Sequence, residues 1–154
     1  MKTKNILPIF LLLFVCFISC KKESPNDPPA INNLLVNGCK PIEDNAKSVG
    51  PPFPQEYITL NTIDDSYLLF NHINSILNCQ PGQITVALSI SNDTITLNEE
   101  ESEYSADCVC PFDITFKLGP LEEGIYTIMF QKFGGTFKEY SLDFNKSTDI
   151  RIDL

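Results

Sequence analysis

The stretch that decides the fold lies at residues 112–130 and reads FDITFKLGPLEEGIYTIMF. In its first part, apolar residues alternate with the polar residues Asp113, Thr115 and Lys117. A period of two is typical of a strand that buries one face. Residues 125–130 are nearly all apolar, which suits a central strand. The stretch therefore predicts two strands of an all-β protein.

The segment LEEGIYTI at residues 121–128 adds a second signal. Greek-key sandwiches carry a tyrosine near the start of such a strand, and its hydroxyl bonds to backbone a few residues upstream. Tyr126 fits this tyrosine corner, with Leu121 before it and Gly124 allowing a tight approach. The alternative is an ordinary strand tyrosine. Both readings concern folding and not an active site.

The period of two continues over most of the chain after residue 55. In residues 67–78 the apolar positions change phase after Phe70, which indicates a bulge. Hairpin turns are predicted at residues 91–93 and at Gly134-Gly135. The predicted strands are 56–61, 67–78, 84–90, 95–97, 112–118, 125–130, 140–144 and 150–154. Seven or eight short strands predict an immunoglobulin-like, Greek-key β-sandwich.

The chain before residue 56 has a different composition. Residues 20–33 are polar and proline-rich, which predicts a flexible tether. We assign residues 34–154 to a single sandwich domain, because the length suits one domain. Its first part, residues 34–55, is expected to be an irregular arm, although Leu34 to Val36 could start a strand.

The first residues read as an export signal. Lys2 and Lys4 precede an apolar segment at residues 6–18, which is shorter than the roughly 20 residues that a membrane-spanning helix needs. The following FISC at residues 17–20 resembles the lipobox of bacterial lipoproteins. That resemblance implies that residues 1–19 are a signal peptide and that Cys20 carries acyl chains, which anchor the mature chain to a membrane. The alternative is an ordinary signal peptide that a cysteine happens to follow.

The charge of the chain limits its partners. The formal net charge is −9, and without Lys2 and Lys4 the remaining chain has 9 basic residues against 20 acidic ones, a net charge of −11. This balance argues against nucleic acid, which requires a basic patch, and against anionic lipid as a direct partner. Solubility alone explains the acidity, and a cationic ligand or a divalent ion is the alternative.

Six cysteines are present, of which Cys16 lies within the signal segment and Cys20 at its end. An even number of remaining cysteines in an exported chain predicts two disulfides. Two of them are separated by one residue and are too close to pair with each other. Each of the two must then pair with one of the other two, and both connectivities stay open. The alternative is a zinc site with four thiolates, which we do not favour because only one Cys-x-Cys is present; we expect no metal or cofactor. The four cysteines are Cys39, Cys79, Cys108 and Cys110.

Motifs for catalysis are lacking. His72 is the only histidine, and it is expected to be packed or exposed at an edge. Cysteine nucleophiles need a basic neighbour, whereas Cys108 and Cys110 are beside acids. We therefore expect no enzyme. The acidic stretch NEEESEYSADC at residues 98–108 is expected to be a solvated loop, with a helical turn capped by Asn98 or a Ca²⁺ site as alternatives.

Residues 67–130 resemble a group of small uncharacterised lipoproteins from Bacteroidetes. The shared features are a strand ending in NC, a hairpin, an acidic loop, a C-x-C and then G-P-L-x-x-G-x-Y. The resemblance implies a secreted, lipid-anchored β-sandwich and carries no known activity. Residues 93–95, DTI, also resemble the O-glycosylation motif of Bacteroidetes, which would place a glycan on Thr94.

The sequence thus predicts a lipid-anchored protein of the cell envelope. We expect a non-catalytic binding or accessory module displayed at the outer membrane, with a protein or glycan as ligand. The alternative is a structural or assembly component that faces the periplasm, and a metal-binding module that uses the four cysteines is less favoured. Surface export in these bacteria is linked to acidic residues after the lipidated cysteine. Here residues 21–23 read KKE, with one acid behind two lysines, so the face of the membrane stays open.

Overall fold

The computed structural model describes residues 27–40, 53–103 and 106–154, and these residues form strands and no helix. Nine strands are present within these ranges, where the sequence predicts seven or eight. The all-β class is confirmed, while the segment at 1–19 and Cys20 lie outside the described residues. No helix in these ranges has the length and hydropathy that crossing a bilayer requires. The strands are β1 (Ala30–Asn37), β2 (Tyr57–Ile63), β3 (Tyr67–Asn78), β4 (Ile84–Ser91), β5 (Thr94–Glu101), β6 (Val109–Gly119), β7 (Gly124–Lys132), β8 (Lys138–Phe144) and β9 (Asp149–Asp153).

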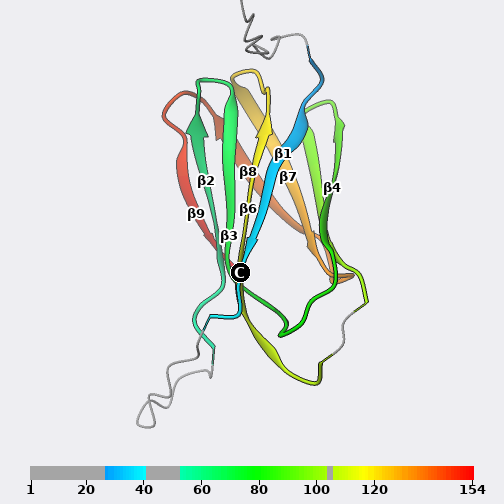
Figure 1. Ribbon diagram of the computed structural model, residues 1–154. Helices are drawn as coiled ribbons and strands as arrows, with labels where there is room; N and C mark the ends of the chain where they lie inside the picture. Colours follow the sequence, from blue (N-terminus) through cyan, green and yellow to red (C-terminus); the bar gives the residue numbers. More distant parts are fainter. Residues whose placement is uncertain (1–26, 41–52, 104–105) are drawn as a thin grey trace, which may run out of the picture.

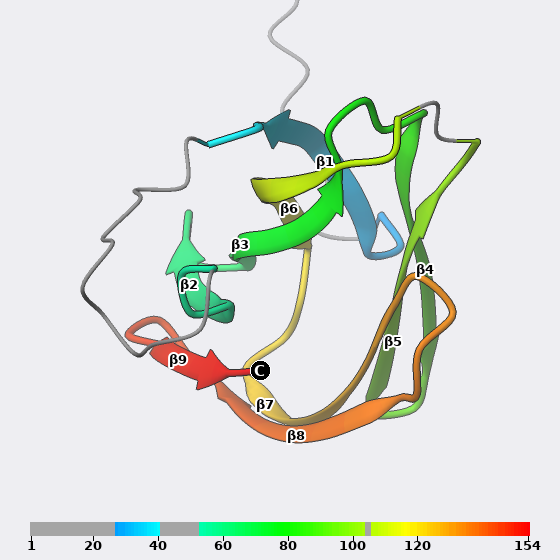
Figure 2. The same cartoon turned by 90° about the horizontal axis from the view of Figure 1, so that it is seen from below.

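The strands form two sheets that face each other (Figures 1 and 2). One sheet has the order β1-β6-β3-β2-β9 and the other the order β4-β5-β7-β8. The chain crosses between the sheets after β3, β5, β6 and β8, so β3 and β6 are neighbours although the hairpin between them belongs to the other sheet. This is the arrangement of a Greek-key sandwich. The pair β5 and β7 is parallel, and the other pairs are antiparallel.

The core fills the space between the sheets with the inward-facing apolar residues of both. Phe70 on β3 stacks on Phe116 of β6 with ring centroids 4.5 Å apart, and it meets Phe130 of β7 at 5.8 Å. All three rings are at most 3% exposed. Burial of such a side chain contributes about 1.5–3 kcal/mol to stability, so these contacts between sheets are a main source of cohesion.

The predicted strand at 67–78 has the predicted limits and the predicted bulge. The register of β3 against β6 shifts between His72 and Ser75, and Asn74 has a φ of 59°. The Asp113 carboxylate accepts a hydrogen bond from the Asn74 backbone N–H at 3.1 Å, and Lys40 donates to the Asn74 side chain at 2.9 Å. The shift comes after His72 and not directly after Phe70, so His72 still faces the core.

The first strand differs from the expectation. β1 begins at Ala30, inside the expected tether, and it includes residues 34–37 of the expected irregular arm. It pairs antiparallel with β6 from Ala30 opposite Gly119 to Asn37 opposite Asp113. No residue of β1 is fully buried. Only Ile31 and Leu34 of this strand pack against the core, and both are half-buried. The apolar residues at 34–36 therefore indicate part of the strand but not its extent.

The segment at 119–126 has the geometry of a tyrosine corner at its end. The Tyr126 hydroxyl donates to the Glu122 carbonyl at 2.9 Å, and the half-buried ring meets Phe144 with centroids 6.5 Å apart. Leu121 is buried. Gly124 is not needed for a tight approach, because a Cβ there would lie 3.9 Å from the Tyr126 ring, an ordinary contact.

The tight approach occurs at Gly119 instead. Its φ is +150°, and an added Cβ would lie 2.7 Å both from the Ser66 carbonyl oxygen and from the Tyr67 ring. Both the backbone conformation and the space therefore require glycine at this position.

These two glycines make a matched test of the local fold. Gly119→Ala should lower the free energy of unfolding by about 1–3 kcal/mol, because it forces an unfavourable φ and a clash with backbone. Gly124→Ala should change it by less than about 0.5 kcal/mol. Urea unfolding followed by circular dichroism measures both values. Equal effects of the two substitutions would contradict this account of the turn.

Candidate functional site

Four charged or titratable side chains gather at one end of the space between the sheets. We call them the charged cluster, and they are Glu56, His72, Glu99 and Lys132. Each continues an inward-facing row of its strand: Glu99, for example, follows Ile95 and Leu97 at intervals of two. The rows end together because β5 and β7 run parallel, with Glu99 opposite Lys132. The cluster therefore interrupts the apolar core near this end, while Leu77 and Phe112 continue the core beyond His72 on the side of β3 and β6.

The imidazole of His72 is the centre of the cluster. Its side chain is fully buried, with Nδ1 2.8 Å from Glu99 Oε2 and Nε2 2.8 Å from Glu56 Oε1. An ionised carboxylate can only accept hydrogen bonds, so both ring nitrogens must donate, and the ring is then a cation. Burial opposes this charge, but the hydrogen bonds and charges of Glu56 and Glu99 outweigh it and raise the pKa of His72.

Glu56 joins the buried histidine to the surface. Its carboxylate also pairs with the Lys132 ammonium, and both side chains are 24% exposed. Burial alone would raise the pKa of Glu56, yet the hydrogen bonds from His72 and Lys132 outweigh burial and lower that pKa. Glu56 is therefore an anion held between two cations.

Glu99 is the member of the cluster whose burial costs the most free energy. Its side chain is fully buried, and its Oε1 has no hydrogen-bond partner among the described residues. Removing charges from water costs several kcal/mol per ion, and the attraction within a buried pair does not always offset this cost. Stability alone is therefore a weak explanation for the cluster. Its member Glu56, whose pKa is shifted by its neighbours, lines a hollow, and such a group in a cleft is typical of a functional site.

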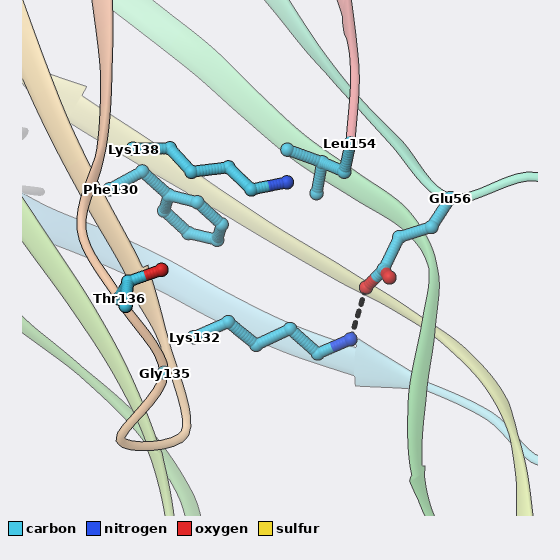
Figure 3. A pocket seen from close by; sticks show the side chains of 7 residues that line it. All are labelled: Glu56, Phe130, Lys132, Gly135, Thr136, Lys138 and Leu154. Atoms are coloured by element: carbon cyan, nitrogen blue, oxygen red, sulfur yellow. Dashed lines mark hydrogen bonds and ion pairs between the residues drawn. The ribbon is translucent and has the colours of Figure 1, made fainter.

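A hollow with a volume of about 250 Å³ opens beside the cluster (Figure 3). Phe130 is part of its lining, and Lys138 and Thr136 point into it from the β7–β8 hairpin. No described residue forms an ion pair or hydrogen bond with the Lys138 side chain. The complete lining is Glu56, Phe130, Lys132, Gly135, Thr136, Lys138 and Leu154.

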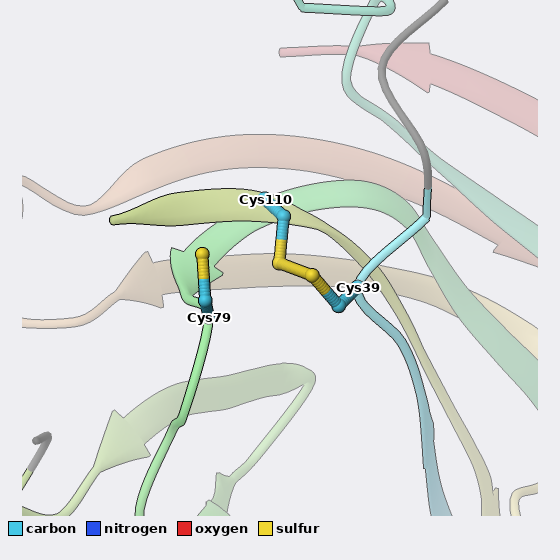
Figure 4. Close-up of side chains that lie close together, drawn as sticks. All are labelled: Cys39, Cys79 and Cys110. Atoms are coloured by element: carbon cyan, nitrogen blue, oxygen red, sulfur yellow. A yellow bond between two sulfur atoms is a disulfide. The ribbon is translucent and has the colours of Figure 1, made fainter. Parts of the chain in front are cut away.

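The four predicted cysteines lie at the same end of the sandwich and form two disulfides. Cys39 pairs with Cys110 at a Cα–Cα distance of 5.1 Å, and Cys79 pairs with Cys108 at 5.5 Å. The register decides between the two connectivities that the sequence allows: Asn78 lies opposite Val109, so Cys79 comes next to Cys108, and its backbone N–H donates to the Cys108 carbonyl at 3.0 Å. The sulfur atoms of Cys39, Cys79 and Cys110 lie within 4.8 Å of one another, so the two disulfides are neighbours (Figure 4). Sulfurs that are bonded in pairs are not thiolates and do not hold a metal in this state.

One of the disulfides fixes a strand that packing holds weakly. Cys39 follows β1, which has no fully buried residue, and its bond to Cys110 ties that edge strand to β6. The chain-entropy argument gives about 4–5 kcal/mol for a separation of 71 residues and about 3–4 kcal/mol for the 29 residues between Cys79 and Cys108. The end of the sandwich that carries the hollow is therefore covalently clamped.

The acidic stretch does not form the solvated loop, capped helical turn or carboxylate cluster that the sequence suggests for its first part. Residues up to Glu101 belong to β5, where Glu99 faces the core and Glu100 faces solvent. Side chains of adjacent strand residues point to opposite faces, so these carboxylates do not converge on a cation. Asn98 donates to Glu100 at 2.8 Å within the strand. Thr94, the predicted glycan acceptor, is half-buried at the start of β5.

Sequence reasoning located the cysteines but missed the charged cluster. It treated His72 alone and took Glu99 for a loop residue, and it gave Glu56 and Lys132 no role. The alternation of the strands could have revealed them. Each lies two residues from a buried apolar residue and therefore faces the same side of the sheet; these buried residues are Ile58, Phe70, Leu97 and Phe130.

Comparisons of the chain with protein-family models, with curated proteins and with solved structures found no match in any of the three. Function must therefore be inferred from the charged cluster, the hollow and the disulfides.

The charged cluster predicts how stability varies with pH. Folding raises the pKa of His72 above 6.5. The stability that His72 contributes is therefore complete below pH 6.5 and is lost as the pH rises through its pKa in the folded state. Folding lowers the pKa of Glu56 below 4.5, so its contribution is complete above pH 4.5 and is lost as the pH falls through the folded-state value. The contribution of the cluster should be greatest between these limits, and urea unfolding at a series of pH values measures it.

The matched variant is His72→Gln, which removes the only histidine of the chain. It should lower stability by about 3–5 kcal/mol, because it leaves a buried carboxylate unpaired, and it should abolish the decline above pH 6.5. The double variant with Glu99→Gln should recover part of the loss. A wild-type free energy of unfolding that stays constant from about pH 6 to about pH 8.5 would show that His72 is not a buried cation.

Proposed function

We propose that the chain is a lipid-anchored protein of the cell envelope, a non-catalytic binding or accessory module displayed at the outer membrane. The observation that carries this proposal is that the two ends of the sandwich differ. The chain enters at one end, where β1 begins, and the hollow and the disulfides lie at the opposite end. An anchored protein with its site at the far end can present that site away from the membrane.

The strand registers define the two ends. β1 begins opposite Gly119, whereas both Val36, near the end of β1, and His72 lie opposite Ile114. The charged cluster is therefore level with the far end of β1. In Figure 1, β1 begins at the top, and the mark C, at Leu154 of the hollow's lining, lies toward the bottom. Eight residues of strand span roughly 26 Å, which is the approximate distance between the two ends.

The length of chain before β1 limits how far the body can lie from a membrane. Ten residue steps separate Cys20 from Ala30, and an extended chain covers at most about 3.6 Å per residue, or about 36 Å in all. Acyl chains on Cys20 would thus keep the near end of the sandwich close to the bilayer and leave the hollow facing outward.

Two further features support an exported binding module. Disulfides persist in oxidising compartments outside the cytoplasm, and two clamp this sandwich. Carboxylates occupy both ring nitrogens of His72, which leaves no ring nitrogen to activate a nucleophile. A metal-binding role for the four cysteines is less well supported, because their sulfurs are consumed in the two disulfides.

The anchor is tested by Cys20→Ser in full-length protein expressed in a bacterium with a lipoprotein pathway. Wild-type protein should fractionate with membranes and have the mass of an acylated mature chain. The variant should accumulate as unprocessed precursor, because the thiol that receives the diacylglyceryl group is absent. A variant that fractionates with membranes at mature length would refute the anchor.

Protease treatment of intact cells then distinguishes display from the periplasmic alternative. Loss of the mature domain without lysis supports display at the surface. Full protection in intact cells, with digestion after lysis, would instead favour a structural or assembly component facing the periplasm.

A further inference from the structure

The lining of the hollow contains one cation, Lys138, that is exposed and lies outside the charged cluster. Lys138 lies directly opposite Phe130 in the β7–β8 pair, and residues that are opposite each other in a ladder share a face of the sheet. Its side chain therefore extends over the same inward side as the Phe130 ring, and Figure 3 shows its ammonium directed into the hollow. Among the described residues, none pairs with this ammonium.

The other cation of the hollow is already balanced. Lys132 pairs with Glu56, and Glu56 also accepts from His72. Two carboxylates, counting Glu99, thus face two cations within the charged cluster, and Lys138 adds a third positive charge. The charges of these five side chains sum to about +1 when His72 is protonated, although the whole chain carries −9.

The remaining walls are largely apolar. The Phe130 ring, 3% exposed, lines the hollow, and the Leu154 side chain lies across from it. A backbone hydrogen bond of 3.1 Å from Leu154 to Glu56 fixes that side. Thr136 offers a hydroxyl from the hairpin. The volume of about 250 Å³ is below the roughly 300–1,000 Å³ of sites for drug-sized molecules, so the occupant must be small.

We infer that the hollow binds a small monocarboxylate with a short apolar body. The carboxylate pairs with the Lys138 ammonium, with the Thr136 hydroxyl as a further donor, and the apolar body covers Phe130 and Leu154. A single uncompensated ammonium matches a single negative charge, and Glu56 does not repel the ligand because Lys132 and His72 neutralise it. This inference rests on the proposed binding function and specifies its ligand class.

The test is a titration of the purified full-length mature protein, labelled with ¹⁵N and held in detergent micelles, with three probes of equal length: hexanoate, hexanamide and hexylamine. Hexanoate should shift the amide signals of Gly135, Thr136 and Lys138. Hexanamide and hexylamine should bind about tenfold more weakly or not at all, because they lack the charge-assisted bond to the ammonium.

Two substitutions localise the effect. Lys138→Gln keeps a polar side chain, removes its charge and should weaken hexanoate binding about tenfold. Lys146→Gln is the matched control, because Lys146 follows the opposite end of β8 and its side chain is 65% exposed. It should leave hexanoate binding unchanged.

Each other outcome overturns a defined part of the account. Equal or tighter binding of hexanamide or hexylamine at these amides would refute the carboxylate preference and leave the proposed binding module in place. Equal weakening by both lysine substitutions would show a general effect of charge and would also refute the inference. If no probe shifts these amides, both the inference and the hollow as the ligand site of the proposed module fail, whereas the anchor is tested separately through Cys20.

Discussion

The structure depends on one interaction, the double hydrogen bond of a buried imidazole with two carboxylates. His72 on β3 bonds Glu99 on β5 in the facing sheet and Glu56 at the entry to β2. It thereby joins the two layers near one end of the sandwich. The carboxylates offset the cost of placing a cation in the core, and the cation holds Glu56 where it can pair with Lys132. Glu56 and Lys132, held in this way, form one wall of the hollow.

The two ends of the sandwich have different physical characters. The end where β1 begins is built from tight turns, among them the one at Gly119 and the hairpin that precedes Thr94. The opposite end has two neighbouring disulfides, the charged cluster and the hollow. Covalent bonds fix the strands on one side of that end, and the buried pair of His72 and Glu99 bridges the two sheets. A binding site built on such supports needs little ordering when a ligand arrives.

Most of the fold could be predicted from the sequence because apolar residues at intervals of two are a strong local signal. The strand at 67–78 and the two strands at 112–130 show this clearly. β1 could not be predicted in full, since backbone pairing and the bond at Cys39 hold it rather than a buried face. The disulfide connectivity depends on the register of that strand. The charged cluster was missed because phase shows that His72 and Glu99 face inward, but only the sheet arrangement shows that they meet.

The most direct test of this account is the protonation state of His72 at neutral pH. It is the only histidine of the chain, so protein labelled with ¹⁵N in histidine gives one set of ring signals for His72 in a long-range ¹H–¹⁵N spectrum. The account predicts that both ring nitrogens carry protons at pH 7 and remain protonated above the ordinary pKa of 6.5. A neutral ring with one unprotonated nitrogen at pH 7 would contradict it, because a carboxylate would then face a ring nitrogen that cannot donate.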